Sequence, residues 1–358
     1  MTGRGRHGRA TIADVAAAAG VSTSTASLVF RRRERVSPGT RDRILAAAAE
    51  LGYEGPHPVA SSLRSGRSGI VGIVIAERVR QAFQNPVAVA TMDGLSDVLD
   101  REGFGQLLLP GRAEPRDERP EALRMLPVDA VVFATRGEEF DELLPLVRTR
   151  GVPVVGIEGP HAEGVTLVEV DDVGGMAAMA RHVAALGHRR VGVLMRTTRP
   201  GRTRAPGPVQ PIGEGLETIA NRTIRGRLEA VRGVFPDAVR VEAGGRDAEA
   251  GAAAARVLLA LPDRPTALLA QNDQLAAGAL AAAAETGLRV PGDLTVTGFD
   301  GVDAPWLGRR LTTVRQPLQE RGRRAGELVT ALLRGEDVPP RTVLPVELEP
   351  GETAGPPA

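Results

Sequence analysis

The chain has 358 residues, 42% of them hydrophobic, no cysteine and a net charge of +1. The length suits two or three domains, and the lack of cysteine excludes disulfides, thiolate metal sites and a cysteine nucleophile. No apolar run reaches the roughly 18 residues of a membrane span, and the chain does not start with the apolar core of a secretory signal. We therefore expect a cytoplasmic protein without a membrane partner.

The charge is distributed unevenly along the chain. Residues 1–67 hold eleven arginines against five acidic residues, a net charge of +6, whereas the remainder holds 34 arginines against 39 acidic residues, a net charge of −5. A basic segment on an acidic body suggests that the segment meets a polyanion, although a solvated basic tail has the same composition. Residues 1–10, rich in Gly and Arg, are predicted to be a disordered basic arm.

Residues 11–55 have the pattern of a helix-turn-helix domain. Thr11 opens a Thr-x-x-Asp sequence that can cap a helix, and Gly20 suits the left-handed end of that helix. Ser22 can cap a second helix after a tight Gly-Val-Ser turn, and Ser37-Pro38 begins a third. Two short helices joined in this way are typical of DNA-binding proteins.

Residues 68–350 alternate short apolar runs with helical patterns, and residues 351–358 form a tail rich in Pro and Gly. Alternation of strands and helices predicts parallel sheets with right-handed crossovers. There are too many strands for one sheet, so we expect two similar subdomains with a ligand at the carboxyl ends of the strands. The predicted strands are 69–75, 105–109, 130–133, 152–156, 190–194, 267–270 and 294–298. The predicted helices are 87–102, 174–186, 224–234, 247–261 and 273–286.

These segments resemble the LacI/GalR family of repressors. The headpiece resemblance lies in the runs Thr11-Ile-Ala-Asp-Val-Ala and Ala19-Gly-Val-Ser-Thr-Ser-Thr-Ala-Ser27. The body resemblance lies in Gln271-Asn-Asp-Gln, Gly298-Phe-Asp300 and Leu311-Thr-Thr-Val-Arg-Gln-Pro317. The resemblance implies an all-α helix-turn-helix headpiece followed by an α/β, periplasmic-binding-protein-like body of two parallel-sheet subdomains.

The resemblance also implies domain boundaries. Residues 56–67 would be a hinge that becomes a short helix on DNA, and residues 68–350 an effector-binding and dimerisation domain. The first subdomain would comprise about 68–168 and 318–341, and the second about 169–316 and 342–350, with a final strand at Thr342–Leu348. The stretch Arg199–Gly215 looks inserted and is either a lid or a disordered loop, and its composition favours the loop.

For DNA, the resemblance places the second helix in the major groove. Base readers would be Thr23, Ser24 and Leu28, and Leu28 stands where the family usually has Arg, so the operator should depart from the family consensus at that base. The alternative is that Leu28 turns into the core. Other residues are also expected at the DNA interface. Helix-start and phosphate-contacting residues are Thr11, Ser22, Thr25 and Ser27, and the loop arginines are Arg31 and Arg33. The hinge contributes His57, Ala60 and Leu63, of which Leu63 would wedge into the minor groove.

For an effector, the resemblance places polar groups in the cleft between the subdomains. Asn272, Asp300 and Arg227 are the main candidates and Glu158 and Gln316 the weaker ones, since amides, carboxylates and guanidinium groups fix hydroxyls or carboxylates. Asn272 and Asp300 could instead be structural turn residues. Asp273 is better explained as an acid at a helix start, and His188 as structural. The plausible aromatic wall residues are Phe83, Phe299 and Trp306.

Other functions agree less well with the sequence. It has no His-Glu-x-x-His, P-loop or Gly-x-Ser-x-Gly motif, so we expect no enzyme, cofactor or metal. A solute-binding protein would not need a helix-turn-helix headpiece. A DNA-binding regulator that is controlled by a protein partner, or that has no effector, remains an alternative. We expect a nucleoid-associated homodimer on a pseudo-palindromic operator, with dimer contacts from 87–102 and 275–285 and with a sugar or related metabolite as effector. By resemblance to the family, we expect a repressor that is released from DNA when it binds its ligand.

Overall fold

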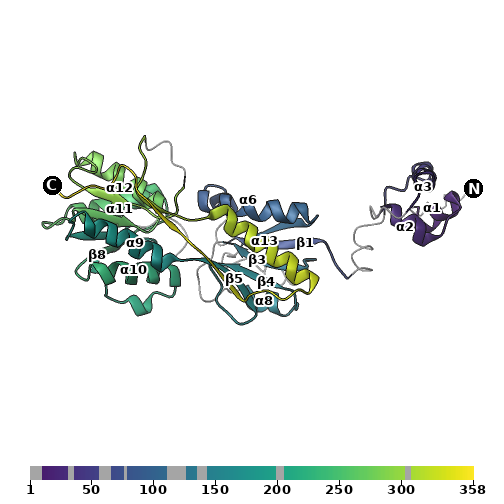
Figure 1. Cartoon of the computed structure of the whole chain (residues 1–358), viewed down its shortest axis with the longest axis horizontal. Helices are drawn as coiled ribbons and strands as arrows, with labels where there is room; N and C mark the ends of the chain where they lie inside the picture. Colours follow the sequence, from purple (N-terminus) through teal and green to yellow (C-terminus); the bar gives the residue numbers. More distant parts are fainter. Residues whose placement is uncertain are drawn as a thin grey trace, which may run out of the picture. The chain divides into compact units, whose positions relative to one another are not determined.

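The structure is a computed structural model, and it describes residues 10–30, 36–55, 66–75, 79–110, 126–134, 143–198, 205–302 and 308–358. Its contacts divide the chain into two compact units, Met1–Gly69 and Ile70–Ala358, called here the headpiece and the body (Figure 1). Each unit is described by itself.

The headpiece contains the three predicted helices. They are α1 (Ile12–Ala19), α2 (Thr23–Phe30) and α3 (Pro38–Glu50). Thr11 caps α1 in a capping box, because Asp14 N–H donates to its hydroxyl while its own N–H donates to the Asp14 carboxylate at 2.8 Å. Gly20 ends the helix at φ 67°, a conformation that favours glycine. The core lies between the helices and includes the fully buried Val15, Ala26 and Ile44.

Among the described residues, no single helix is long and apolar enough to cross a membrane. The pair α1 and α2 passes that length and composition test only when the two are joined, and they are bent by 110° with respect to each other. Both helices contribute to the headpiece core instead.

The first subdomain of the body is built on a parallel sheet in the order β12-β5-β4-β3-β1-β2. Its strands are β1 (Ile70–Ile75), β2 (Gly105–Pro110), β3 (Ala130–Ala134), β4 (Val154–Ile157), β5 (Val165–Val170) and β12 (Arg341–Leu344). Its helices are α5 (Val79–Ala82), α6 (Pro86–Arg101), α8 (Leu144–Arg148) and α13 (Leu318–Arg334). α6 and α13 cover one face and α8 the other. Because helices cover both faces of this sheet, its strands are apolar at nearly every position.

The second subdomain has a sheet in the order β10-β9-β6-β8-β7, parallel except for the edge strand β7. Its strands are β6 (Val191–Met195), β7 (Val209–Pro211), β8 (Val239–Glu242), β9 (Ala267–Ala270) and β10 (Thr295–Thr297). Its helices are α9 (Asp172–Ala185), α10 (Arg222–Val234), α11 (Ala248–Leu259) and α12 (Asp273–Glu285), with a short 3-10 turn η1 (Leu216–Thr218). α9 and α10 cover one face, and α11 and α12 the other.

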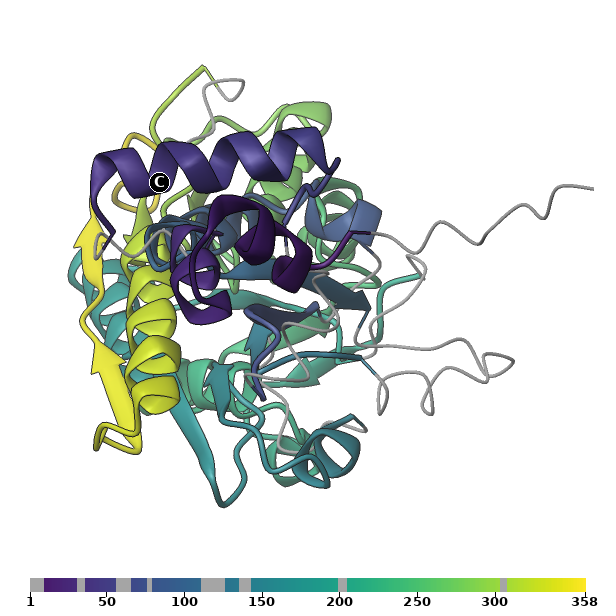
Figure 2. The ribbon, with the colours of Figure 1, turned by 90° about the vertical axis from the view of Figure 1, so that its right-hand side faces the viewer.

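The chain passes between the subdomains three times, after β5, after β11 (Thr313–Arg315) and between β12 and β13 (Glu347–Glu349). The predicted single strand over 342–348 is therefore wrong. Its first part, β12, pairs with β5 in the first sheet, and only β13 pairs with β11. β12 and β13 are drawn as separate yellow arrows in Figure 2. Pro345 follows β12 directly, and because proline has no N–H to donate, the ladder breaks there. Likewise β5 extends the first subdomain to residue 170.

Two further predictions need correction. Of the stretch 199–215, residues 205–215 are described, and they are not a disordered loop: β7 pairs antiparallel with β8, and Ile212 is fully buried. The segment 351–358 is not a free tail, since Thr353 is fully buried and its carbonyl accepts a hydrogen bond from Val296 N–H at 2.9 Å. Composition alone cannot show that an edge strand is available to pair with such a segment.

The two helices on the first sheet touch through their backbones. A Cβ on Gly322 of α13 would lie 1.9 Å from the carbonyl oxygen of Thr91 on α6, and a Cβ on Gly94 of α6 would lie 1.9 Å from the carbonyl oxygen of Gln319. Only glycine allows an approach this close. The crossing holds α13, and with it the start of the polar network described next, against the first subdomain.

Candidate functional site

The outer side of α2 carries the predicted base readers. Thr23 and Ser24 are exposed, whereas Ala26 and Val29 of the same helix are buried in the headpiece core. Leu28 is half-buried and lies outside the core cluster. This position is closer to the predicted outward orientation than to the alternative of a core residue.

The start of α2 is held by hydroxyl groups. The Ser22 hydroxyl accepts from Thr25 N–H at 3.1 Å and lies 2.8 Å from the hydroxyls of both Ser24 and Thr25. Ser27 is half-buried. The hydroxyl groups therefore order the helix N-terminus, whose N–H groups suit a phosphate. Arg31, Arg33, His57, Ala60 and Leu63 lie outside the described residues.

Within the body, polar residues follow the carboxyl ends of several parallel strands. Glu158 follows β4, Arg196 follows β6, and Asn272 and Asp300 come after β9 and β10. Carboxyl ends are where open α/β sheets bind their ligands. Glu158 has a φ of 62° and Asp300 a φ of 128°, backbone conformations that are uncommon outside glycine. Strained backbone of this kind concentrates at functional sites.

Arg227 of α10 occupies the centre of this region and is 1% exposed. Its Nε donates to Asp172 Oδ1 at 2.8 Å, its Nη1 donates to the carbonyl of Gln271, and its guanidinium carbon lies 3.5 Å from the ring centroid of Phe299. An ion pair, a backbone acceptor and an aromatic face thus fix one guanidinium group.

Arg321 of α13 joins the two subdomains. Its fully buried guanidinium forms an ion pair with Glu158 and donates to Thr91 Oγ1 at 2.9 Å and to Gln316 Oε1 at 3.0 Å. The Gln316 amide in turn donates to Asp300 Oδ1 at 2.7 Å. The network therefore runs from the first sheet to the end of β10 in the second.

Burial and neighbouring charges shift the pKa values of the carboxyl groups in this network in different directions. Burial, with the neighbouring Asp273, raises the pKa of Asp300 to about 7. Burial also raises the pKa of Asp172, in spite of its ion pair. For Glu158, burial acts in the same direction, but the arginine charges around it, Arg321 foremost, outweigh burial and lower its pKa.

The structure thus brings five of the predicted effector residues into one network or its wall: Arg227, Asp300, Glu158, Gln316 and Phe299, the last stacked on Arg227. Asn272 caps α12, because its Oδ1 accepts from Leu275 N–H at 2.9 Å, and its amide nitrogen donates to the carbonyl of Arg246 at 3.0 Å.

Other predicted residues lie elsewhere. Phe83 is 58% exposed, so the structure does not place it as a wall of the buried network, and Trp306 lies outside the described residues. Asp273 is buried and accepts from Thr313 Oγ1 at 2.6 Å. The structural role predicted for His188 is confirmed, because its ring bonds to Thr266, Thr295 and the carbonyl of Gly355.

Sequence reasoning missed three members of the region: Asp172, Arg321 and Arg196. Asp172 directly follows Asp171, and Arg321 lies in a charged helix; neither pattern shows which of the like residues is buried. Arg196 had a usable signal, since it directly follows a buried strand. Among the residues that the structure describes, no group of His, Asp and Glu could hold a metal ion.

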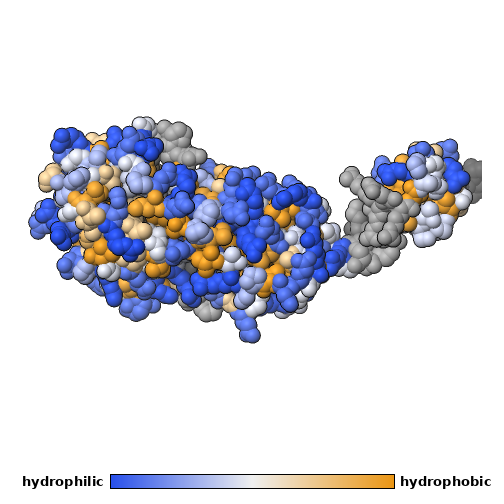
Figure 3. Space-filling view, viewed as in Figure 1, coloured by the Kyte–Doolittle hydropathy of each residue, from blue (hydrophilic) through white to orange (hydrophobic). Residues whose placement is uncertain are grey.

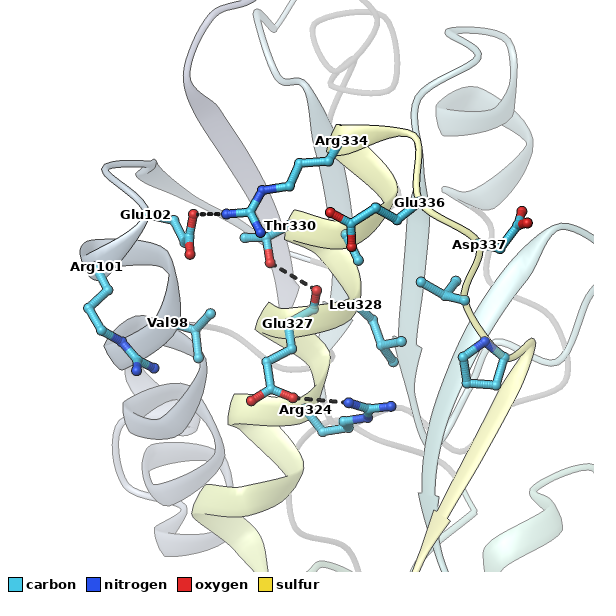
Figure 4. A pocket seen from close by; sticks show the side chains of 13 residues that line it. Val98, Arg101, Glu102, Arg324, Glu327, Leu328, Thr330, Arg334, Glu336 and Asp337 are labelled. Atoms are coloured by element: carbon cyan, nitrogen blue, oxygen red, sulfur yellow. Dashed lines mark hydrogen bonds and ion pairs between the residues drawn. The ribbon is translucent and has the colours of Figure 1, made fainter. Parts of the chain in front are cut away.

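A separate pocket of about 480 Å³ lies on the surface between α6 and α13 (Figure 4). Arg334 pairs with Glu102 across it, and Arg324 pairs with Glu327 at 3.1 Å. None of the predicted site residues line this pocket. In Figure 3, hydrophilic and hydrophobic residues are interspersed over the visible face of the body.

Comparison with known proteins gives matches along most of the chain. Residues 11–55 match the family described as "Bacterial regulatory proteins, lacI family", residues 69–207 match "Periplasmic binding proteins and sugar binding domain of LacI family", and residues 180–354 match "Periplasmic binding protein-like domain".

Curated relatives match at full length. An HTH-type transcriptional regulator of Mycolicibacterium smegmatis is 37% identical over 366 residues, and one of Mycobacterium tuberculosis is 40% identical over 365 residues; each alignment covers 98% of both chains. The regulator IpsA of Corynebacterium glutamicum is 32% identical and covers 97% of this chain and 98% of its own.

Solved structures agree. A complex of the transcriptional regulator CelR with cellobiose has a TM-score of 0.65 at 28% identity and covers 96% of this chain and 100% of its own. The lac repressor dimer bound to operator and the anti-inducer ONPF shares the fold, with a TM-score of 0.74 at 24% identity over 97% of this chain and 100% of that one. On these matches, the chain belongs to the LacI family of bacterial transcriptional regulators, which are DNA-binding proteins and not enzymes.

Proposed function

We propose that the chain is a repressor whose affinity for its operator is controlled by a small molecule bound between the two subdomains of the body. The observation that carries the proposal is the buried polar network at the carboxyl ends of the strands. It runs from Glu158 and Arg321 in the first subdomain to Gln316 and Asp300 in the second. The cellobiose complex of the related regulator CelR supports a carbohydrate or related metabolite as the class of effector.

On DNA, the chain would act as a homodimer on a pseudo-palindromic operator. Thr23 and Ser24 would read base edges, since they are exposed at the N-terminal end of α2. Loop arginines would contact phosphates, which position the protein without specifying the sequence. Leu63 of the linker would enter the minor groove and kink the duplex.

The two activities would be coupled through the network. A ligand that contacts Gln316 competes with its bond to Arg321, which links the second subdomain to the first. It therefore binds the two relative arrangements of the subdomains with different affinity, which is what a shift between two states requires. The arrangement of the first subdomain would then decide whether the linker engages DNA.

The first test is selection of bound sequences from a random DNA pool, with the full-length protein at one fixed salt concentration. We expect an enriched palindrome with a flexible central step. Leu28→Arg should move the preference at one base of each half-site towards guanine, since a bidentate Arg–guanine contact contributes about 1–3 kcal/mol of discrimination. A folded wild-type protein that enriches no sequence would contradict the repressor proposal.

The second test uses the selected operator and a panel of mono- and disaccharides, with anisotropy of labelled DNA as the readout. We expect one or more of them to release the wild-type protein. Asp300→Asn should bind the operator but fail to respond, and the exposed Asp263→Asn should respond as the wild type does. An unaltered response in Asp300→Asn would remove Asp300 from the effector site.

A further inference from the structure

Arg196 differs from the other arginines of the network. It follows β6 at the carboxyl edge of the second sheet, and its backbone N–H donates to Gln271 Oε1 at 3.2 Å. The Nε of its side chain is buried and has no hydrogen-bond partner within the described part of the chain. The groups whose charges act on it are Arg227, Arg246, Glu158 and Asp300, which places its guanidinium inside the proposed effector site.

The acidic groups around Arg196 already have partners. Asp172 is bonded to Arg227, and Glu158 to Arg321. Asp300 accepts from the Gln316 amide. The described residues therefore supply no carboxylate that forms a hydrogen bond with Arg196.

Arg196 is half-buried as a residue, and a guanidinium whose Nε is buried without such a partner is costly. Desolvation of a charge is repaid only by good pairing and by hydrogen bonds to its N–H groups. An unsatisfied buried group in a native structure calls for an explanation such as a ligand. A guanidinium presents a planar fork that matches a carboxylate or a phosphate.

We propose that the effector carries an acidic group, a carboxylate or a phosphate, and that Arg196 binds it. This rests on the proposed function, since it names the chemical class of the ligand at that site. A neutral sugar would satisfy the hydroxyl-binding groups of the network but would leave the charge of Arg196 uncompensated.

The electrostatics of the region agree with this assignment. Burial, with the charges of Arg227 and Arg246, lowers the pKa of Arg196 to about 10, so the guanidinium stays charged at neutral pH. Because burial raises the pKa of Asp300 to about 7, this carboxyl is a weak counter-charge at the same pH.

The test compares neutral and acidic ligands of the same shape on the full-length protein. The probes are galactose with galacturonate, glucose with glucose 6-phosphate, and inorganic phosphate alone, and the readout is the unfolding temperature at increasing ligand concentration. The variant is Arg196→Met. The control is Arg190→Met, which removes an exposed arginine at the opposite end of the same strand.

We expect acidic probes to stabilise the wild type and Arg190→Met at lower concentrations than their neutral counterparts. Arg196→Met should lose this preference, with an affinity for the acidic probes reduced about tenfold or more, as expected when a hydrogen-bonded charge pair loses one partner. Without ligand, Arg196→Met should unfold at a higher temperature than the wild type, because a buried charge without a partner has been removed.

Three results would overturn the inference. They are an Arg196→Met protein that is less stable than the wild type without ligand, acidic probes that bind no better than neutral ones, and acidic probes, phosphate included, that never shift the unfolding temperature. Operator selection by the wild type is a separate readout. Its failure would refute the repressor proposal and leave these ligand measurements standing.

Discussion

Replacing Asp300 with Asn should change how the stability of the protein depends on pH. The carboxyl is 6% exposed, and burial with Asp273 raises its pKa from 3.8 to about 7. Between these two values the folded state holds a proton that the unfolded state has released. The contribution to stability is therefore fully present below about pH 4 and is lost as the pH rises through 7. Asn keeps the oxygen that accepts from Gln316 and tolerates a positive φ, but it cannot ionise.

The magnitude follows from the size of the pKa shift. Each pH unit in this window changes the free energy of unfolding by about 1.4 kcal/mol, so the wild type should lose about 2–3 kcal/mol between pH 5 and pH 8 through this group alone. Asp172 and Asp273, whose pKa values burial also raises, remain in all the proteins compared. The difference between variants therefore reports Asp300 together with its interaction with Asp273.

The assay is urea unfolding of the full chain, followed by circular dichroism at pH 5 and pH 8. Wild type and the exposed Asp263→Asn should show the same loss of stability towards pH 8, and Asp300→Asn should show a loss smaller by about 2–3 kcal/mol. Parallel losses in all three proteins would refute the argument that burial keeps Asp300 protonated.

Two more predictions concern the scaffold. Gly322→Ala places a Cβ 1.9 Å from the carbonyl oxygen of Thr91, so we expect the free energy of unfolding, measured by thermal unfolding, to fall by about 1–3 kcal/mol. The control is Gly233→Ala on α10, where nothing lies within 4 Å, and it should be neutral or stabilising by up to about 1 kcal/mol. Equal effects of the two substitutions would refute the close-contact explanation. Thr11→Ala removes the cap of α1 and should destabilise the headpiece by about 1 kcal/mol, as measured by hydrogen exchange. Thr11→Ser keeps the capping hydroxyl and should retain the stability. If the two variants do not differ, the capping box contributes nothing to stability.

Local signals were sufficient for the three headpiece helices and for several buried strands, but the predicted helices did not include α13, and the predicted strands did not include β5 or β8. The strand predicted at 267–270 coincides with β9, since four apolar residues lie between Pro265-Thr266 and a polar Gln-Asn pair. Thr11 and Gly20, the residues at its two ends, were likewise a local signal that located α1. Such signals fail where pairing depends on distant residues: β7 and the segment around Thr353 form because the edges of an existing sheet are free to receive them.

The site was predictable only in part. Arg227, Asp300, Glu158 and Gln316 stand in motifs that the family resemblance identifies, and the structure brings them together. Arg321 could not be chosen from its helix, because its ion-pair partner lies 163 residues away.

The split construction of the first subdomain reverses the order in which the two main sheets of the body can be completed during synthesis. Strands β6 to β10 of the second sheet are contiguous in sequence, but the first sheet waits for α13 and β12, which leave the ribosome after all of them. Until then β5 is an open edge, and the face that Leu328 and Val329 cover is bare. The first sheet, which is begun first, is thus completed after the second sheet, and a nascent chain held before residue 318 exposes apolar surface of the kind that chaperones bind.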